Sequence, residues 1–193
     1  MPNRNRLDKL IVVDLEATCW EHGPPPGEES EIVEIGLCLL DIPTGRLELK
    51  RSILIRPERS RLSPFCSELT TLTQEQVDQG ISFAEACALL RGEYNSRRRI
   101  WASYGDYDRR QLEEQCADRG VPYPFGLTHL NVKSLAALIL RLEQEVPLPE
   151  ALAHFGWKLE GVYHRGDDDA WNIARLLRAL LWGQHDLENE DGR

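Results

Sequence analysis

The sequence predicts an α/β domain with a mixed β-sheet and helices packed on it. Three observations support this fold class. Three apolar runs rich in strand-forming residues follow one another near the start of the chain, and the segments after them switch to helical spacing. Short strand-like runs then alternate with helical segments, as they do in α/β folds. The length of 193 residues suits one domain, because domains commonly contain about 100–200 residues.

Strand candidates fill the first part of the chain. Residues 9–15 form a short apolar run that includes consecutive β-branched residues, and residues 31–41 form a second apolar run. Residues 47–55 alternate between apolar and polar side chains, as a half-exposed strand does. A proline-rich loop at 21–30 and a Pro-Thr-Gly turn at 43–45 separate these runs. We therefore expect three consecutive antiparallel strands.

Helical spacing and capping residues mark the elements that follow. Ser63 and Thr73 are expected N-caps, and Gln76 stands three residues after Thr73, which fits a capping box. Gly120 is a natural residue for a helix end. We expect helices over residues 83–94, 107–119, 130–145, 149–155 and 167–181, and short strands at 99–104 and 129–132.

The composition is that of an ordinary globular protein, with 41% hydrophobic and 28% charged residues. No apolar run approaches the ~20 residues of a membrane span, and the run at 10–13 is too short for a signal-peptide core. We therefore expect no membrane association and a cytoplasmic location. Residues 1–193 are interpreted as a single domain, with a core at about 8–182 and a polar tail at 183–193.

The cysteine count and the net charge exclude several classes of protein. Five cysteines without a CxxC pair predict buried free thiols rather than a disulfide framework or a zinc site. The net charge of −9 argues against a protein that coats long nucleic acid. It leaves open an enzyme that holds only a strand end, because cations bound to a carboxylate-rich site would cancel part of the charge.

Asp14 and Glu16 stand at the end of the first apolar run. Residues two apart in a strand share a face, so both carboxylates point the same way. Two buried carboxylates repel each other and are costly to desolvate, and a divalent cation removes that conflict. The alternative is that the strand has already ended and Glu16 is a loop acid.

Helical phase separates two nearby aspartates in the middle of the chain. Asp108 shares a stripe with Leu112 and Cys116, so it is expected to point inward. Asp106 is in phase with the charged residues of the same segment. We therefore expect Asp106 to face solvent and to cap the start of the helix.

The same reasoning applies to three consecutive aspartates near the end. Asp169 lies on the apolar stripe that includes Ile173, whereas Asp168 is rotated about 100° away. Asp167 is a natural N-cap. His164 precedes this helix, where the chain can fold it over the same site, although a lone histidine is more often a packed or exposed residue. The inward acids together offer hard oxygen ligands, which favour Mg²⁺ or Mn²⁺ over zinc.

These residues resemble the three exonuclease motifs of the DnaQ-like DEDDh superfamily. The motifs are Asp14-x-Glu16, Tyr107-Asp108 and His164-x4-Asp169. The segments at 14–19, 62–66, 69–77 and 164–174 resemble the Eri-type branch, the histone-mRNA and small-RNA 3′ exoribonucleases. The resemblance covers roughly residues 8–182, nearly the whole chain. Thr71 stands where the family usually has glycine, which leaves the shape of that turn open.

The resemblance implies a ribonuclease-H-like fold, with a five-stranded mixed sheet flanked by helices. It implies a 3′-5′ exonuclease that uses two metal ions, Mg²⁺ or Mn²⁺, and releases nucleoside 5′-monophosphates from a free 3′-OH end. The implied catalytic residues are Glu16 and His164, with His164 as the general base. The implied metal ligands are Asp14, Glu16, Asp108 and Asp169.

By family position, the terminal nucleotide is expected to contact Leu15, Ala17, Thr18, Phe65, Tyr107 and His164. The alternative for Phe65 and Tyr107 is that both are core residues. The expected partner is a single-stranded 3′ end, with RNA favoured over DNA, and the sequence identifies no protein partner. Two other functions stay open. They are a DNA exonuclease of proofreading or repair type and a catalytically silent binding module.

Two further features have two interpretations each. Glu34 either lies beside the acidic site or faces solvent. The arginines at 97–99 and 109–110 either contact phosphates or are solvated surface charges.

Overall fold

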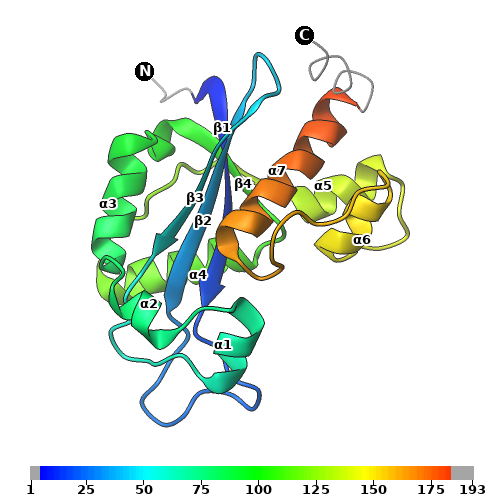
Figure 1. Cartoon of the computed structure of the whole chain (residues 1–193). Coiled ribbons are helices and arrows are strands. Elements are labelled where there is room, and N and C mark those ends of the chain that lie inside the picture. Colours follow the sequence, from blue (N-terminus) through cyan, green and yellow to red (C-terminus); the bar gives the residue numbers. More distant parts are fainter. Residues whose placement is uncertain (1–4, 184–193) are drawn as a thin grey trace.

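The computed structural model describes residues 5–183, and its strands form one mixed sheet (Figure 1). The first three strands pair antiparallel, as predicted, and the last two join the sheet in parallel. The five-stranded mixed sheet flanked by helices is therefore confirmed. The strands are β1 (Arg6–Ala17), β2 (Ile32–Asp41), β3 (Leu47–Leu54), β4 (Arg99–Ser103) and β5 (His129–Asn131), in the spatial order β3-β2-β1-β4-β5.

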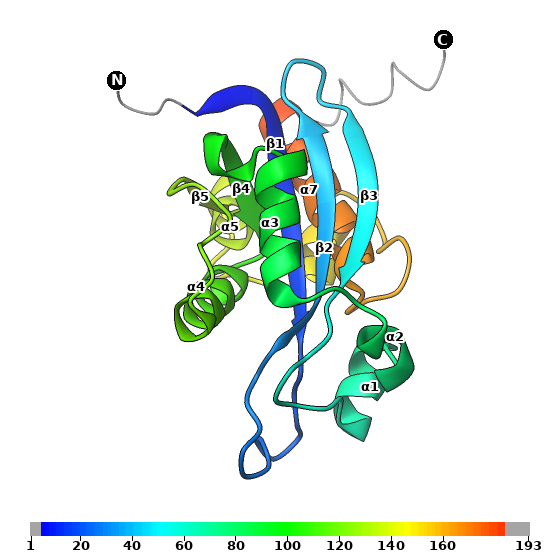
Figure 2. The ribbon, with the colours of Figure 1, turned by 90° about the vertical axis from the view of Figure 1, so that its left-hand side faces the viewer.

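Helices cover both faces of this sheet. In Figure 2, α3 lies in front of the strands and α7 lies behind them. One apolar layer joins the sheet to α3 and α4, and the other joins it to α5, α6 and α7. The helices are α1 (Pro64–Thr70), α2 (Gln74–Asp78), α3 (Phe83–Glu93), α4 (Tyr107–Arg119), α5 (Val132–Ile139), α6 (Leu148–Ala153) and α7 (Gly166–Trp182), with a short 3₁₀ helix at Ser96–Arg98.

Side chains of β1 alternate between the two apolar layers. Ile11 and Val13 pack in the layer of α3 and α4. Leu10 and Val12 pack in the layer of α7. Because the side-chain period of a strand is two residues, this alternation sets the direction of every later side chain in β1.

The predicted helix caps of the middle segment are confirmed. The Ser63 side chain caps α1, and Thr73 and Gln76 form both bonds of the capping box of α2. Gly120 ends α4 in the left-handed conformation. Thr71 also takes a left-handed conformation, with φ 61°. The turn thus keeps the shape that favours glycine, although a non-glycine residue there costs on the order of 1–2 kcal/mol.

The helix expected at 130–145 is shorter than predicted. It is α5, which ends at Ile139. Arg141 adopts φ 55°, and the next N–H, from Leu142, bonds to the carbonyl of Ala137. This left-handed ending closes the helix in the way that a glycine usually does. The sequence has no glycine at that position, so the ending gave no signal.

Three further predictions concern the cysteines, membrane-spanning helices and the extent of the domain. Four cysteines are buried, Cys19 is partly exposed, and all five are free thiols. No helix within residues 5–183 is long and apolar enough to cross a membrane. The polar tail lies outside the described residues beyond Gly183, and the interpretation as a single domain stays a prediction.

Candidate active site

β1 carries Asp14 and Glu16 to the end of the sheet. Both continue the face of Leu10 and Val12, which packs toward α7. Glu16 is 8% exposed, and in the strand register it lies opposite Glu34 of β2. Because β1 continues through Ala17, Glu16 is a buried strand residue, and the alternative of a loop acid is wrong.

α7 begins directly against the backbone of β2. Gly36 lies opposite Asp14 in the sheet, and a Cβ atom at Gly36 would lie 1.8 Å from the carbonyl carbon of Gly166. Only glycine leaves that space, so the first residue of α7 contacts the strand. Asp169 follows Gly166 by three residues. This close approach therefore brings Asp169 to the acids of β1.

The buried Glu34 carboxylate caps α7 from the neighbouring strand. It accepts hydrogen bonds from the N–H of Gly166 at 3.0 Å, from the Arg165 guanidinium at 3.3 Å and from the Ser52 hydroxyl. Glu34 is 0% exposed, so of its two interpretations the position beside the acidic site is confirmed. The predicted cap at Asp167 is wrong. α7 already begins at Gly166, so Asp167 lies inside the helix, and the Glu34 carboxylate accepts the N–H of Gly166.

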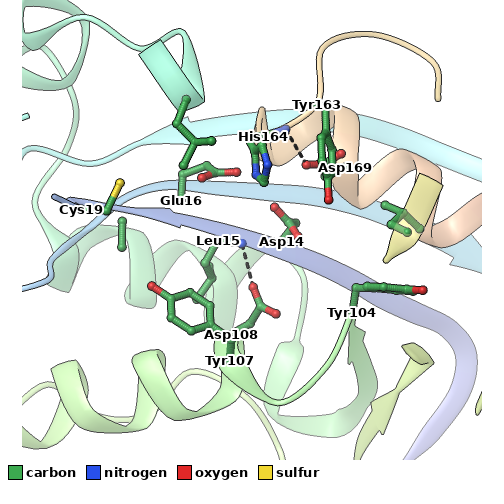
Figure 3. A pocket seen from close by; sticks show the side chains of 13 residues that line it. Asp14, Leu15, Glu16, Cys19, Tyr104, Tyr107, Asp108, Tyr163, His164 and Asp169 are labelled. Carbon is green, nitrogen blue, oxygen red and sulfur yellow. Dashed lines mark hydrogen bonds between the residues drawn. The ribbon is translucent and has the colours of Figure 1, made fainter. Parts of the chain in front are cut away.

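His164 occupies a left-handed backbone conformation, with φ 63°. The Asp169 carboxylate accepts a hydrogen bond from the backbone N–H of His164 at 2.8 Å and so stabilises this strained turn. One ligand atom from each of Glu16, His164 and Asp169 lies within 4.8 Å of the other two. In Figure 3 the imidazole ring lies between the carboxylates of Glu16 and Asp169. His164 thus shares a site with the acids instead of packing in the core.

Asp108 reaches the same site from the start of α4. β4 pairs with β1 no further than Val12, so Leu15 lies beyond the end of β4. The Asp108 carboxylate accepts the Leu15 N–H at 2.9 Å, and Asp108 is 4% exposed. Asp106 faces outward, as its helical phase predicts. Asp106 occupies the predicted N-cap position of α4, but its carboxylate accepts a hydrogen bond from Arg109 at 3.3 Å instead of one from the helix backbone.

This set of donors fits a divalent cation. The Oδ1 atom of Asp169 is buried and has no hydrogen-bond partner among the described residues. Buried polar atoms are nearly always paired, so an orphaned carboxylate oxygen indicates a missing partner. Carboxylate oxygens are the ligands that Mg²⁺ and Mn²⁺ prefer. The residues that the sequence singled out therefore fit the predicted metals.

Comparison with known proteins places this site in a family. A model of the RNase_T exonuclease family matches residues 11–177. The chain belongs to this exonuclease family. The 3'-5' exonuclease Snipper of Drosophila melanogaster is 30% identical over 194 residues, which cover 89% of this chain and 69% of Snipper. Human 3'-5' exoribonuclease 1 is 30% identical over 185 residues, which cover 90% of this chain and 52% of that protein. The exonuclease chain therefore spans between about half and two thirds of these relatives.

A solved structure gives the same assignment. The nuclease domain of 3'hExo, a DEDDh family member, bound to rAMP, superposes with a TM-score of 0.80 at 29% identity. The superposition covers 93% of this chain and 94% of that chain. The predicted DEDDh superfamily, the resemblance to the exoribonuclease branch and the ribonuclease-H-like fold are confirmed.

Burial and mutual repulsion raise the pKa values of the acids in the exonuclease site. Burial, followed by the charges of Asp108 and Glu16, holds the pKa of Asp14 well above its ordinary value. Burial and the charge of Asp169 raise the pKa of Glu16 to about 9. Burial raises the pKa of Asp108 to about 6 and that of Asp169 to about 7. The metal-free site therefore resists ionisation at neutral pH, and a bound cation would remove this repulsion.

We expect the metal-free exonuclease to lose stability as the pH rises from 7 to 8. A raised carboxyl pKa means that the folded chain holds a proton that the unfolded chain has released. Stability then falls with rising pH until the folded-state pKa is reached. For Glu16, whose folded-state pKa is about 9, the loss is on the order of 1 kcal/mol per pH unit. The lowered pKa values of His164 and His129 act at lower pH and do not offset this loss.

Thermal unfolding in EDTA measures this effect. The melting temperature is expected to fall from pH 7 to pH 8, and saturating Mg²⁺ is expected to raise it more at pH 8 than at pH 7. The matched control is Glu16→Gln, which removes one of the titrating groups and should make the fall in EDTA shallower, while Asp14 continues to contribute. A parent protein whose melting temperature in EDTA rises over this interval would contradict the assigned shifts.

Most of the predicted nucleotide contacts line one pocket of about 310 Å³. Leu15, Ala17 and Tyr107 lie in its wall together with the acids and His164. Tyr107 is 53% exposed and Phe65 is 41% exposed, so the alternative that they are core residues is wrong. Phe65 lies on α1 and is not among the lining residues of this pocket.

Thr18 is not among the lining residues of this pocket. Its hydroxyl accepts the Glu31 N–H at 2.9 Å and donates to the Glu29 carbonyl at 3.0 Å. The Thr18 N–H bonds to the Glu31 carbonyl at 2.8 Å. Thr18 is 1% exposed, and its hydroxyl and N–H hold the adjoining loop, so a contact of its backbone with a nucleotide stays a prediction.

Three of the arginines named above, Arg99, Arg109 and Arg110, bond to groups of the protein itself. The Arg99 guanidinium bonds to the Asp8 carboxylate and to the Tyr94 carbonyl, so Arg99 is neither a solvated charge nor a free phosphate ligand. Arg109 donates a hydrogen bond to the carboxylate of Asp106, and Arg110 donates one to the backbone carbonyl of Asp106. None of these arginines lines the acidic pocket.

Cys19 and Leu69 line the pocket and belong to the motif segments, although they were not predicted as site residues. Outside those segments, the sequence missed three more residues on the wall of the pocket. They are Tyr104, Leu148 and Tyr163. Tyr104 could have been found, because it follows β4 and the carboxyl ends of adjacent parallel strands meet at one edge of a sheet. Tyr163 lies in a loop without periodicity, and Leu148 reaches the pocket through the tertiary position of α6. Neither gives a signal in the sequence.

Proposed function

We propose that this chain is a metal-dependent 3′-5′ exonuclease that removes nucleotides one at a time from the free 3′-OH end of single-stranded RNA. The convergence of Asp14, Glu16, Asp108 and Asp169 with His164 on one pocket carries this proposal. The orphaned oxygen of Asp169 supports a metal at that point. The products are nucleoside 5′-monophosphates.

Two divalent ions, Mg²⁺ or Mn²⁺, are the proposed cofactors. Asp14, Glu16, Asp108 and Asp169 would hold them, directly or through water. When bound, such ions lower the pKa of a water molecule and stabilise the leaving 3′-oxygen.

His164 is the proposed general base. Burial lowers the pKa of His164, so the neutral imidazole that can accept a proton is present at neutral pH. The hydrogen bond from the backbone N–H of His164 to the Asp169 carboxylate holds the residue beside the acids. His164 takes the proton of the attacking water as the oxygen–phosphorus bond forms and the bond to the 3′-oxygen breaks. The 3′-oxygen takes up a proton from solvent water, so the shortened strand ends in a new 3′-OH and the terminal nucleotide leaves as its 5′-monophosphate.

The terminal nucleoside is proposed to lie against Leu15, Ala17 and Tyr107. These residues line the pocket beside Glu16, and the exposed ring of Tyr107 offers a face on which any base can stack. Such stacking contributes about 1–3 kcal/mol per base and tolerates every sequence. The acids are therefore placed at the phosphate that precedes this nucleoside.

RNA is the proposed substrate because human 3'-5' exoribonuclease 1 and the rAMP-bound nuclease domain of 3'hExo are similar to this chain over most of its length. A DNA exonuclease is the alternative. The cytoplasmic location expected from the sequence stays a prediction.

Digestion of matched 5′-labelled RNA and DNA single strands tests this proposal. With Mg²⁺ or Mn²⁺ we expect a ladder of strands that shorten from the 3′ end, with RNA degraded faster than DNA. EDTA should stop the reaction. A 3′-phosphate should block it, because that group adds charge and bulk where the terminal ribose binds. Cleavage of a circular single strand would contradict the exonuclease, and faster loss of DNA would favour the alternative substrate.

A further inference from the structure

The active-site pocket extends to both sides of the acids. In Figure 3, Cys19 and Tyr107 lie on one side of Asp14, and Tyr104 and Tyr163 lie on the other. The first arm, with Leu15, Ala17, Cys19 and Tyr107 in its wall, is the one assigned above to the terminal nucleoside. The second arm consists of Tyr104, Leu148 and Tyr163.

The chain fixes two residues of the second arm. The Tyr104 hydroxyl donates to the carbonyl of Val146 at 2.7 Å, which holds the tyrosine ring at the wall of the pocket. Val146 stands two residues before Leu148, and Leu148 belongs to the same apolar cluster as Tyr104. The first turn of α6 is thereby tied to the end of β4. This part of the arm is preformed.

Tyr163 completes the second arm and keeps an uncommitted hydroxyl. Its ring centroid lies 3.9 Å from that of His164, and the residue is 39% exposed. Within residues 5–183 the Tyr163 hydroxyl has no hydrogen-bond partner, whereas the Tyr104 hydroxyl has one. Burial and the charges of the nearby acids raise the pKa of Tyr163, so the phenol stays protonated as a donor. Tyr163 thus offers an aromatic face and a free O–H.

A phosphodiester that is cleaved at the acids joins two nucleosides. If the terminal nucleoside fills the first arm, its neighbour must lie on the other side of the acids. We propose that the second arm binds the penultimate nucleoside, with its base against the rings of Tyr104 and Tyr163 and with the Tyr163 hydroxyl donating a hydrogen bond to that nucleotide. This inference rests on the proposed function, because it takes the acids as the point of cleavage.

Two ligands separate the arms. Adenosine 5′-monophosphate occupies the first arm alone. An adenylyl dinucleotide in which a methylene replaces the bridging 3′-oxygen is uncleavable and occupies both arms. Calorimetry in Mg²⁺ gives the Kd of each ligand without any need for turnover. We expect the parent protein to bind the dinucleotide about 5- to 140-fold more tightly, the range that base stacking gives.

Variants of the two arms should change the two Kd values in different ways. Tyr163→Ala is expected to bring the two Kd values close together and to leave the Kd of the mononucleotide unchanged. Tyr163→Phe keeps the ring and should lose only part of the difference. Tyr107→Ala, in the first arm, should weaken both ligands by the same factor. Because Tyr163→Phe is nearly isosteric, it tests the hydroxyl even where the alanine variant is poorly folded.

Two results would overturn the inference. One is a parent protein that binds both ligands equally. The other is a Tyr163→Ala protein that keeps the full advantage of the dinucleotide. Failure of the proposed function looks different, since it would appear as a parent protein that binds neither ligand in Mg²⁺ and leaves RNA intact.

Discussion

Asp14→Asn is expected to abolish RNA hydrolysis in a protein that stays folded. Asp14 is the acid on which the charges of all the others act, namely Glu16, Glu34, Asp108 and Asp169. Asp14 lines the same pocket as Glu16, Asp108 and Asp169 and is one of the proposed metal ligands. Asparagine keeps the shape of the side chain and removes its charge. The loss of several kcal/mol of transition-state stabilisation lowers the rate by about 10³-fold or more.

Stability gives the second readout of the same variant. Without metal, the parent protein holds mutually repelling carboxylates, so removal of one should raise the melting temperature in EDTA. The gain from saturating Mg²⁺ should shrink, because a ligand is lost. Single-turnover hydrolysis of labelled RNA, with melting curves in EDTA and in Mg²⁺, measures both effects. An Asp14→Asn protein with the parent rate would remove this acid from the mechanism.

Asp106 and Asp108 provide a matched control. They are two residues apart, and both variants replace a carboxylate by an amide. Asp108 is 4% exposed and bonds to the Leu15 N–H, whereas the Asp106 side chain is 42% exposed and bonds to Arg109. Asp108→Asn should lose activity as Asp14→Asn does, and Asp106→Asn should keep it. Equal losses of activity in the two variants would show that activity depends on the negative charge of this surface and not on the position of Asp108 in the site.

Periodicity explains why the acids of the site could be predicted. Strand alternation placed Asp14 and Glu16 on one face, and helical phase chose Asp108 over Asp106 and Asp169 over Asp168. In the structure Asp168 instead bonds to Lys50 and to the Val162 N–H. These rules work because burial imposes the period of the element on its sequence.

Periodicity fails where one element completes another. Glu34 caps α7 from β2, across more than a hundred residues, so local rules assigned the cap to Asp167. Arg141 ends α5 without a glycine. Tyr163 lies in the loop before α7 and lines the pocket, so its place depends on where that helix packs. These features depend on tertiary contacts that a single sequence does not reveal.

Together, these contacts set the position of His164, the proposed general base. The Glu34 carboxylate holds the N–H of Gly166, and Asp169 holds the N–H of His164 two residues before it. Both bonds act on the same short turn. The turn therefore fixes the imidazole relative to Glu16 through the backbone. Within residues 5–183, no hydrogen bond holds the ring itself.

His164→Ala is expected to lower turnover by the ~10²–10⁴-fold that is typical of a lost general base. The carboxylates remain, so the concentration of Mg²⁺ that gives half-maximal stabilisation should stay close to that of the parent. A histidine that instead ligated the metal would show a partial recovery of rate at high Mg²⁺. The rate of the parent should rise with pH to a plateau, with a midpoint below 6.5 because burial lowers the pKa of His164. The variant should lose this rise.

His164→Gly separates catalysis from structure. The residue has φ 63°, a conformation that glycine adopts without strain and that alanine does not. The glycine variant should therefore melt at or above the temperature of the alanine variant while both are equally slow. If His164 were only a structural residue, turnover in the folded fraction would stay near that of the parent in both variants. That result would remove histidine from the mechanism and leave the carboxylates alone to activate the water.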